Sequence, residues 1–352
     1  MFKEVPDFWK SDLQTLDSMA QEYGAKQICV SAGGRPVWAF EYGQKQAITS
    51  RANYSSALGA KDIKAYMDTG DSIKKPVVIL IGAIHGQETE GVAALLNLIF
   101  MLETGSDFGA NFHDSLQEAA EGLRLVIVPV ANPDGRARVV PSSMIGCTEK
   151  DLLYWGQGTW KDGSLCGWPG CKKVHPIKDH VDFLGGYFND DGINLMHDNF
   201  FNPMARETSA LIKLTSDEFA DYVIQLHGGT NDKNMFIPTG FVPPEVTAEI
   251  RQLYEICDAR AKQHSLEFDI SAESKVFNLA SAMHHASGAV CAIFESNQCV
   301  VDVEWGVKYS HEEIYLSHMI LFEELFLRCS ILGPKAALQS FLGHQPVHAS
   351  AS

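Results

Sequence analysis

The sequence predicts an α/β fold, in which a largely parallel sheet is covered by helices on both faces. Short runs of consecutive apolar residues, such as LRLVIVPV at 123–130, are typical of strands that are buried on both faces. These runs alternate along the chain with longer amphipathic segments, which is the order that parallel strands joined by crossover helices require. The chain of 352 residues is long enough for one large domain of this class.

Four strands and four helices are expected in alternation. The strands are predicted at 77–84, 123–130, 222–226 and 290–294, and the helices at 90–102, 204–214, 244–261 and 311–326. The periodicity breaks between 133 and 192, so we expect a long loop insert there that shapes a functional site. Three tryptophans in this segment argue against disorder, namely Trp155, Trp160 and Trp168. We expect a single domain over 1–333 and a mobile C-terminal tail over 334–352.

Composition and charge exclude several classes of partner. The formal net charge is −16, which gives no electrostatic attraction for nucleic acid or for an anionic membrane surface. The apolar run at 77–84 is far shorter than the roughly 18 residues that a membrane-spanning helix needs. The N-terminal stretch is charged and contains a proline, so it does not resemble a secretory signal. Eight cysteines without such a signal are expected to be mostly free thiols in the cytoplasm. The sequence leaves the oligomeric state open.

Metal-binding and acid–base side chains follow the predicted strands at the points where they end. His85 and Glu88 come directly after the first strand, His227 ends the third, and Glu295 ends the fourth. The carboxyl ends of parallel strands share one edge of a sheet, so these four side chains are expected to converge. Two histidines and one carboxylate are a common catalytic zinc set. We therefore expect one Zn²⁺ per chain on His85, Glu88 and His227, with Glu295 as general base.

Simpler interpretations of these motifs exist. His85 could cap a turn, and Glu88 could be placed to favour a helix N-terminus. Glu295 could be a salt-bridged strand end, and the sequence NPDG at 132–135 is by itself a favourable turn. A second cluster lies in CGWPGCKKVHPIKDH at 166–180, whose two cysteines and two histidines fit no standard zinc motif. We interpret that cluster as loop thiols, with a structural metal as the alternative.

Taken together, these motifs resemble the zinc carboxypeptidases of the carboxypeptidase A type. That family has an HxxE pair after a strand, an NPDG turn after the next strand, a histidine ending a third strand and a glutamate ending a late strand. In this chain the matching residues are His85/Glu88, 132–135, His227 and Glu295, and GGRPVWAFEYG at 33–43 resembles the early Gly-Arg-Pro strand of the family. The resemblance covers about 33–329. It implies a mixed, largely parallel eight-stranded sheet with helices on both faces and hydrolysis by a metal-activated water.

The resemblance also implies roles for several further residues. The arginine that stabilises the oxyanion should follow NPDG, so Arg138 is the first choice and Arg136 the second. Asn132 and Asn194 are counted among the substrate-binding residues, as is Arg136 in its alternative role. The substrate is expected to be a peptide or a small amide.

The sequence departs from the family at two positions. The family carries an Asn-Arg pair that grips the terminal carboxylate of the substrate, and Met196-His197 stands in its place. A neutral imidazole does not replace a bidentate guanidinium, so C-terminal recognition is expected to be altered, with His197 in the pocket. No tyrosine lies between Tyr254 and Tyr309, where the family has a substrate-contacting tyrosine. His284 and His285 fall in that region and either contact substrate or belong to an exposed polar loop.

Three functions are compatible with these observations. The first is a zinc-dependent metallopeptidase that hydrolyses an amide bond, carboxypeptidase-like with altered recognition. The second is a small-molecule deacylase of N-acyl amino acids, similar to succinylglutamate desuccinylase and aspartoacylase. The third is a catalytically inactive binding module. The presence of three metal ligands together with Glu295 favours an enzyme over a binding module.

Overall fold

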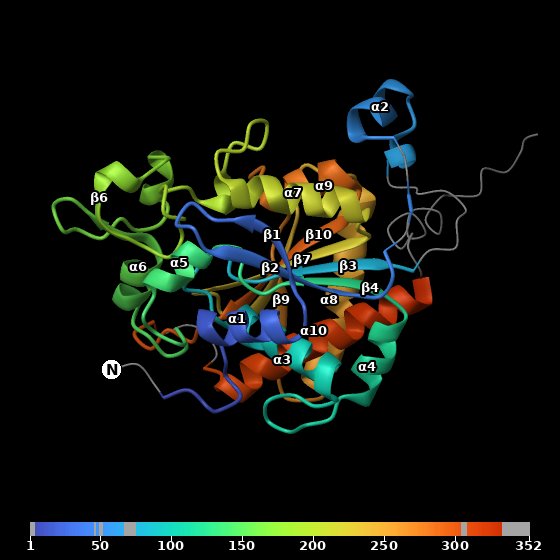
Figure 1. Cartoon of the computed structure of the whole chain (residues 1–352), viewed down its shortest axis with the longest axis horizontal. Helices are drawn as coiled ribbons and strands as arrows, with labels where there is room; N and C mark the ends of the chain where they lie inside the picture. Colours follow the sequence, from blue (N-terminus) through green and yellow to red (C-terminus); the bar gives the residue numbers. More distant parts are fainter. Residues whose placement is uncertain (1–3, 46, 49–51, 67–74, 304–307, 333–352) are drawn as a thin grey trace, which may run out of the picture.

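A central sheet of eight strands organises the fold. The computed structural model describes residues 4–45, 47–48, 52–66, 75–303 and 308–332, and Figure 1 shows the sheet between two layers of helices. In spatial order the strands are β1 (Lys26–Val30), β2 (Pro36–Tyr42), β4 (Arg124–Val128), β3 (Val77–Ile81), β7 (Tyr222–Gly229), β10 (Val290–Asn297), β8 (Asn234–Pro238) and β9 (Phe268–Ile270).

The four inner strands β4, β3, β7 and β10 run parallel, and the strands outside them give the sheet its mixed character. β1 and β2 pair antiparallel with each other, and β2 and β8 each join the parallel centre in the antiparallel sense. β8 and β9 pair in parallel. The predicted fold class, a mixed and largely parallel eight-stranded α/β sheet, is therefore confirmed. The four predicted strands are the four parallel ones, because burial on both faces makes their sequences continuously apolar.

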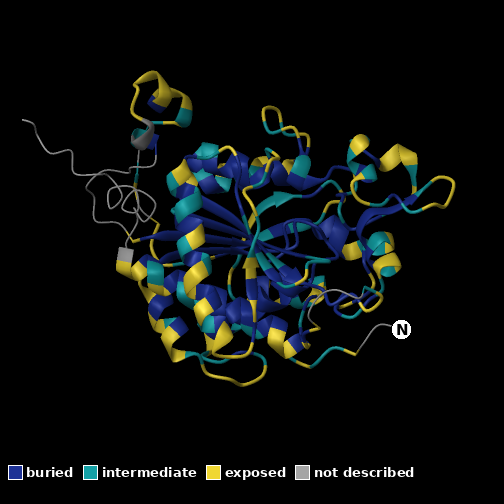
Figure 2. Cartoon of the chain, turned by 180° about the vertical axis from the view of Figure 1, so that it is seen from behind, coloured by how far each residue is buried: buried dark blue, intermediate teal, exposed yellow. Residues whose placement is uncertain are grey.

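Helices cover both faces of the sheet, and each layer encloses its own apolar core. One face carries α7 (Arg206–Glu218) and α9 (Leu279–Ser287). The opposite face carries the larger core, packed under α1 (Leu13–Glu22), α3 (Glu90–Thr104), α4 (Asp114–Glu121), α8 (Pro244–Lys262) and α10 (His311–Leu332). Figure 2 shows the inner part of the sheet as buried between the two layers, and β3, β4, β7 and β10 are buried at almost every position. All four predicted helices are present at the expected places.

The segment at 133–192 corrects the prediction of one long loop. It contains α5 (Pro133–Arg138), α6 (Glu149–Gln157) and a two-stranded antiparallel sheet of β5 (Gly158–Trp160) and β6 (Val181–Leu184), together with short 3₁₀ turns. It also has a small apolar core of its own around Cys166, Cys171 and Phe188. These elements are too short to show a clear periodicity in the sequence. The predicted tail over 334–352 lies outside the described residues.

The described helices include none that combines the length and the apolar character needed to cross a bilayer. The longest of them, α10, carries charged residues at its start, Glu312 and Glu313, and packs against the sheet in the larger core.

Candidate metal centre and catalytic cleft

The structure brings His85, Glu88 and His227 together at the carboxyl edge of the parallel strands. Their ligand atoms all lie within 4.8 Å of one another, and all three residues are buried. Nδ1 of His85 lies 2.8 Å from Oε1 of Glu88, and Nδ1 of His227 lies 2.9 Å from Oε2 of the same carboxylate. Among the described residues this is the only cluster of histidine, cysteine and acidic side chains that meets this ligand spacing.

The hydrogen bonds of His85 indicate that this cluster fits a cation. Oδ1 of Asn194 accepts from the backbone N–H of Met196 and faces Nε2 of His85 at 3.3 Å, so Nε2 must carry the ring hydrogen. Nδ1 of His85 then presents a lone pair to the carboxylate of Glu88, and two acceptors at this distance repel each other unless a cation lies between them. Asn194 thus orients His85 from behind, as residues around metal ligands commonly do.

The carboxylate of Glu88 gives the same indication. Nε2 of His227 is buried without a hydrogen-bond partner within the described part of the chain, which is costly for a polar atom. Burial alone raises the pKa of Glu88, but His85 and His227 outweigh it and lower that pKa to about 2. An ionised carboxylate with two imidazoles is the donor set that zinc prefers. The cluster therefore fits a zinc ion.

Close backbone packing after β3 positions the first two ligands. Ala83 has a φ of 41°, a left-handed conformation that turns the chain sharply toward the helix α3. A Cβ on Gly86 would lie 2.1 Å from the backbone nitrogen of Arg136, so only glycine fits between His85 and α5. The backbone N–H of Gly86 also donates to the carbonyl of Gly186 at 2.7 Å. The glycine of the HGQE sequence is therefore required by packing against the NPDG turn.

Glu295 lies beside the metal cluster on the neighbouring strand. It is the register partner of His227 in the parallel pair β7–β10, so both side chains point to the same face. A Cβ on Gly229 would lie 2.1 Å from Oε1 of Glu295, which shows that the missing side chain makes room for this carboxylate. Burial, and then the negative charge of Glu88, raise the pKa of Glu295, while the positive charge of His227 opposes the shift. A raised pKa suits a general base.

A cleft opens above these residues and is large enough for a small peptide or an amide. Its volume is ≈ 560 Å³, and His85, Glu88, His227 and Glu295 all line it. Apolar side chains form much of its wall, namely Leu152, Leu153, Trp168, Tyr187, Met196, Ile237, Val276 and Ile293. Four of these eight come from 133–192, so this segment contributes to the wall of the cleft.

Tyr187 is a cleft residue that the sequence did not reveal. Its ring stacks on the imidazole of His85, with centroids 3.9 Å apart and an angle of 10° between the planes. Burial, and then the charges of Glu88 and Glu295, raise its pKa well above the usual value, so its hydroxyl stays protonated. Tyr187 comes from the GGYF turn after β6, and no motif marked it as functional.

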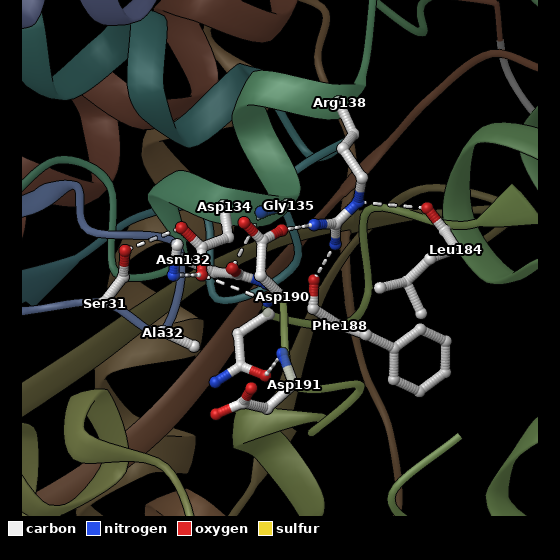
Figure 3. A network of polar contacts seen from close by, with 12 residues as sticks. Ser31, Ala32, Asn132, Asp134, Gly135, Arg138, Leu184, Phe188, Asp190 and Asp191 are labelled. Carbon is white, nitrogen blue, oxygen red and sulfur yellow. Dashed lines mark hydrogen bonds and ion pairs between the residues drawn. The ribbon is translucent and has the colours of Figure 1, made fainter. Parts of the chain in front are cut away.

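The NPDG turn has a structural role in this chain. Asn132 caps α5, since its Oδ1 accepts from the backbone N–H of Gly135 at 2.9 Å, and its amide donates to Gly186. Asp134 is buried and accepts from Ser31, the backbone of Gly33 and the guanidinium of Arg35. Figure 3 shows this network, which also takes in Asp190. Asn132 is not among the residues that line the cleft, and its role in binding substrate stays a prediction.

The two arginines after NPDG also serve the backbone. Arg136 is buried and donates to the carbonyls of Ser11, Val139 and Pro141 at 2.9–3.1 Å. Arg138 donates to the carbonyls of Leu184, Gly185 and Phe188 and pairs with Asp190 (Figure 3). Neither guanidinium lines the cleft. Carbonyl groups of the surrounding turns occupy their donors, and the oxyanion and substrate-binding roles of Arg138 and Arg136 stay predictions.

His197 lies in the cleft, as expected from its place in the sequence. Burial, and then the positive charge of Lys172, lower the pKa of His197 to about 3, so its imidazole is neutral near pH 7. Lys172 is the one lysine or arginine among the described residues that line the cleft, and no sequence motif marks it. Asn194 contributes to the site through His85 and does not line the main cleft.

The remaining candidates lie away from the cleft. His284 and His285 belong to the helix α9, so the loop interpretation is wrong, and neither of them lines the cleft. His284 is buried against Tyr66 and bonds the carbonyl of Ala289, and His285 bonds the carbonyl of Phe241. Their contact with substrate stays a prediction, which these positions do not favour. The cysteines of the second cluster, Cys166 and Cys171, are free and buried.

Comparison with known proteins places these features in context. The sequence profile of the zinc carboxypeptidase family matches residues 13–290, well over half of the chain. Among solved structures, a metallo-carboxypeptidase from Burkholderia cenocepacia matches with a TM-score of 0.55 and 14% identity, covering 93% of this chain and 68% of that one. A metallo-carboxypeptidase from Pseudomonas aeruginosa, solved in complex with (2-guanidinoethylmercapto)succinic acid, matches with a TM-score of 0.54 and 11% identity, covering 92% and 68%. Among curated protein sequences, none matches this chain.

Proposed function

The chain belongs to the zinc carboxypeptidase family, and on this premise we propose that it is a zinc-dependent hydrolase of an amide bond with altered recognition of the substrate's C-terminus. The observation that carries the proposal is the convergence of His85, Glu88 and His227 on one point of the cleft that also holds Glu295. Catalytic zinc sites use three protein ligands and leave a further position open. The opening of all four side chains onto the same cleft supports that arrangement.

Each residue of the site has its own role in the proposed hydrolysis. A zinc ion held by His85, Glu88 and His227, one per chain, would act as a Lewis acid on water and on the substrate carbonyl. Glu295 takes a proton from the attacking water and delivers it to the leaving nitrogen. The apolar wall around Tyr187 excludes bulk water, which strengthens these electrostatic interactions.

The proposed change in recognition of the substrate's C-terminus is based on the positively charged side chains in and near the cleft. Arg136 and Arg138 donate to backbone carbonyls, and His197 is neutral, so none of these three supplies a charged grip on the substrate. Substrate recognition therefore rests on other side chains in the cleft, and on Lys172 as its cation.

The experiment compares three matched substrates with the zinc-loaded protein. These are a blocked dipeptide with a free carboxylate, its C-terminal carboxamide and an N-acyl amino acid. Release of an amino acid from the dipeptide supports a peptidase, whereas cleavage of the acyl amino acid alone supports the deacylase. Glu295→Gln is expected to lower kcat by about 10²–10⁴-fold with zinc retained. Glu255→Gln, which removes an exposed carboxylate of α8, is the matched control and is expected to keep full activity.

Failure to hydrolyse any of the three substrates by a zinc-loaded protein would favour the third function, an inactive binding module.

We also propose a cytoplasmic setting for the protein. The eight cysteines are all free thiols, seven of them buried, which supports a reducing compartment.

A further inference from the structure

A small side cavity adjoins the main cleft and differs from it in charge. Its volume is ≈ 40 Å³, and it shares two residues with the cleft, Lys172 and His197. The main cleft has three carboxylates in its wall, Glu88, Glu149 and Glu295. The side cavity has none, since its lining consists of Cys171, Lys172, His175, Phe188, Asn194 and His197.

Three nitrogen groups line this cavity. Nε2 of His175 accepts from the backbone N–H of Asn194 at 2.9 Å, so Nδ1 carries the hydrogen of that ring when it is neutral. The neutral ring of His197 likewise has one N–H to donate. The ammonium of Lys172 lies 3.3 Å from the centre of the Trp168 ring and forms no ion pair within the described part of the chain. An ammonium and two imidazole N–H groups are a suitable donor set for a carboxylate.

The environment of these groups lacks a compensating negative charge. Burial lowers the pKa of Lys172 to about 8, which still leaves the amine mostly protonated at pH 7. The carboxylate that acts on His175 is Asp198, and its oxygens accept from the backbone N–H groups of Asn199, Met204 and Ala205. A bound anion would therefore relieve an unbalanced positive charge at Lys172.

The size of the cavity limits which part of a substrate enters it. A cavity of about 10–15 Å³ holds one water molecule, so ≈ 40 Å³ admits a group of a few non-hydrogen atoms, such as a carboxylate. Given the hydrolase proposed above, on which this inference rests, we propose that Lys172, assisted by His175 and His197, binds a terminal carboxylate on the leaving side of the amide substrate. Lys172 is thus the specificity-determining residue of the cleft, supplied by the 133–192 segment.

The test measures binding and needs no turnover. Isothermal calorimetry on the zinc-loaded full-length chain gives the Kd of 3-phenylpropanoate and of 3-phenylpropanamide, which differ only in the charged group. The wild type is expected to prefer the acid. In Lys172→Met the acid should bind about 10- to 100-fold more weakly, because a charge-assisted contact is lost, while binding of the amide changes little. Zinc binds carboxylates too, but its contribution is common to all variants, so the change between variants is the readout.

Two further variants control the measurement. Lys172→Arg keeps the charge and should keep most of the preference for the acid. Lys173→Met removes the exposed neighbouring lysine, which does not line either cavity, and should behave as wild type. Thermal unfolding followed by circular dichroism verifies that each variant is folded. Absence of any acid preference in the wild type, or an unchanged preference in a folded Lys172→Met, would overturn the proposal.

The outcomes separate this proposal from the proposed function. If the preference for the acid depends on Lys172 but the protein hydrolyses no amide, the proposed carboxylate subsite is supported and the proposed hydrolase is refuted. If hydrolysis depends on Glu295 but Lys172→Met still prefers the acid, the proposed hydrolase is supported and the proposed subsite is refuted.

Discussion

His227 and Glu295 are register partners in the neighbouring parallel strands β7 and β10. A parallel ladder places such partners side by side on one face of the sheet, so a predicted metal ligand and the predicted general base are held by the backbone itself. Both strands are buried between the two helical layers, which makes this placement rigid. The proposed chemistry therefore depends on the packing of two strands as much as on the residues that they carry.

Gly229 is predicted to control the position of Glu295. A Cβ added at Gly229 would lie 2.1 Å from Oε1 of Glu295, and the carboxylate is flexible enough to move aside. Gly229→Ala should therefore keep the fold and the zinc but lower kcat by about 100-fold, since a displacement of about 1 Å at a reacting group has a cost of this size. Steady-state kinetics and zinc analysis test this. Gly59→Ala, where a Cβ meets nothing within 4 Å, is the control; equal kinetics in the two variants would contradict the prediction.

Gly86 is predicted to be essential for stability. Here the added Cβ would lie 2.1 Å from backbone atoms of Gly135 and Arg136, which have no freedom to move aside. We expect Gly86→Ala to reduce the free energy of unfolding by about 1–3 kcal/mol or more. Urea unfolding followed by circular dichroism measures it, again with Gly59→Ala for comparison. A loss below about 0.5 kcal/mol would show that the turn after β3 is less tightly packed than described.

The buried carboxylate of Asp134 is predicted to give a stability that depends on pH. Burial raises its pKa, but hydrogen bonds from Ser31, from the backbone of Asp190 and Gly33, and from Arg35 outweigh burial, so the pKa is lowered. The stabilisation is therefore fully present above the unfolded pKa, about 3.9, and is lost as the pH falls through the lower pKa of the folded state. Asp134→Asn should cost about 1–3 kcal/mol at pH 7.

The measurement is urea unfolding of wild type and Asp134→Asn at pH 7 and near pH 3. The difference between the two proteins should shrink at the lower pH, because the wild type then begins to lose the charged form as well. Asp191→Asn, which alters an exposed carboxylate in the adjacent turn, should show a small difference at both values. A difference for Asp134→Asn that is the same at both pH values would count against this explanation of the network in Figure 3.

The inner part of the sheet was predictable from sequence, and its outer strands were largely not. β3 and β4 are buried at every position, and such strands leave a continuous apolar run in the sequence. β1 is exposed or half-buried along its length, and β9 has only three residues, so neither leaves a clear pattern. The resemblance of 33–43 to a family strand predicted β2, which periodicity alone did not.

The candidate site, like the sheet, could be predicted from the sequence only in part. His85, Glu88, His227 and Glu295 were identified because they end predicted strands, whose relative positions follow from the sheet. Lys172 and Tyr187 come from 133–192, where the path of the chain depends on distant contacts such as the packing of Gly186 on Gly135. The contacts of Arg138 could not be predicted, because the sequence shows its charge but not the carbonyl groups that bind it. Those partners exist only in the folded chain.

The metal content of the purified protein tests the central claim most directly. Elemental analysis of the wild type should find about one zinc per chain. His85→Ala should lose it, because two of the three ligands remain and Glu88 then lacks one of the imidazoles that face it. Lys173→Met should retain the zinc. A wild-type protein that contains no zinc, even after incubation with the metal, would contradict the account, as would full retention of zinc in His85→Ala.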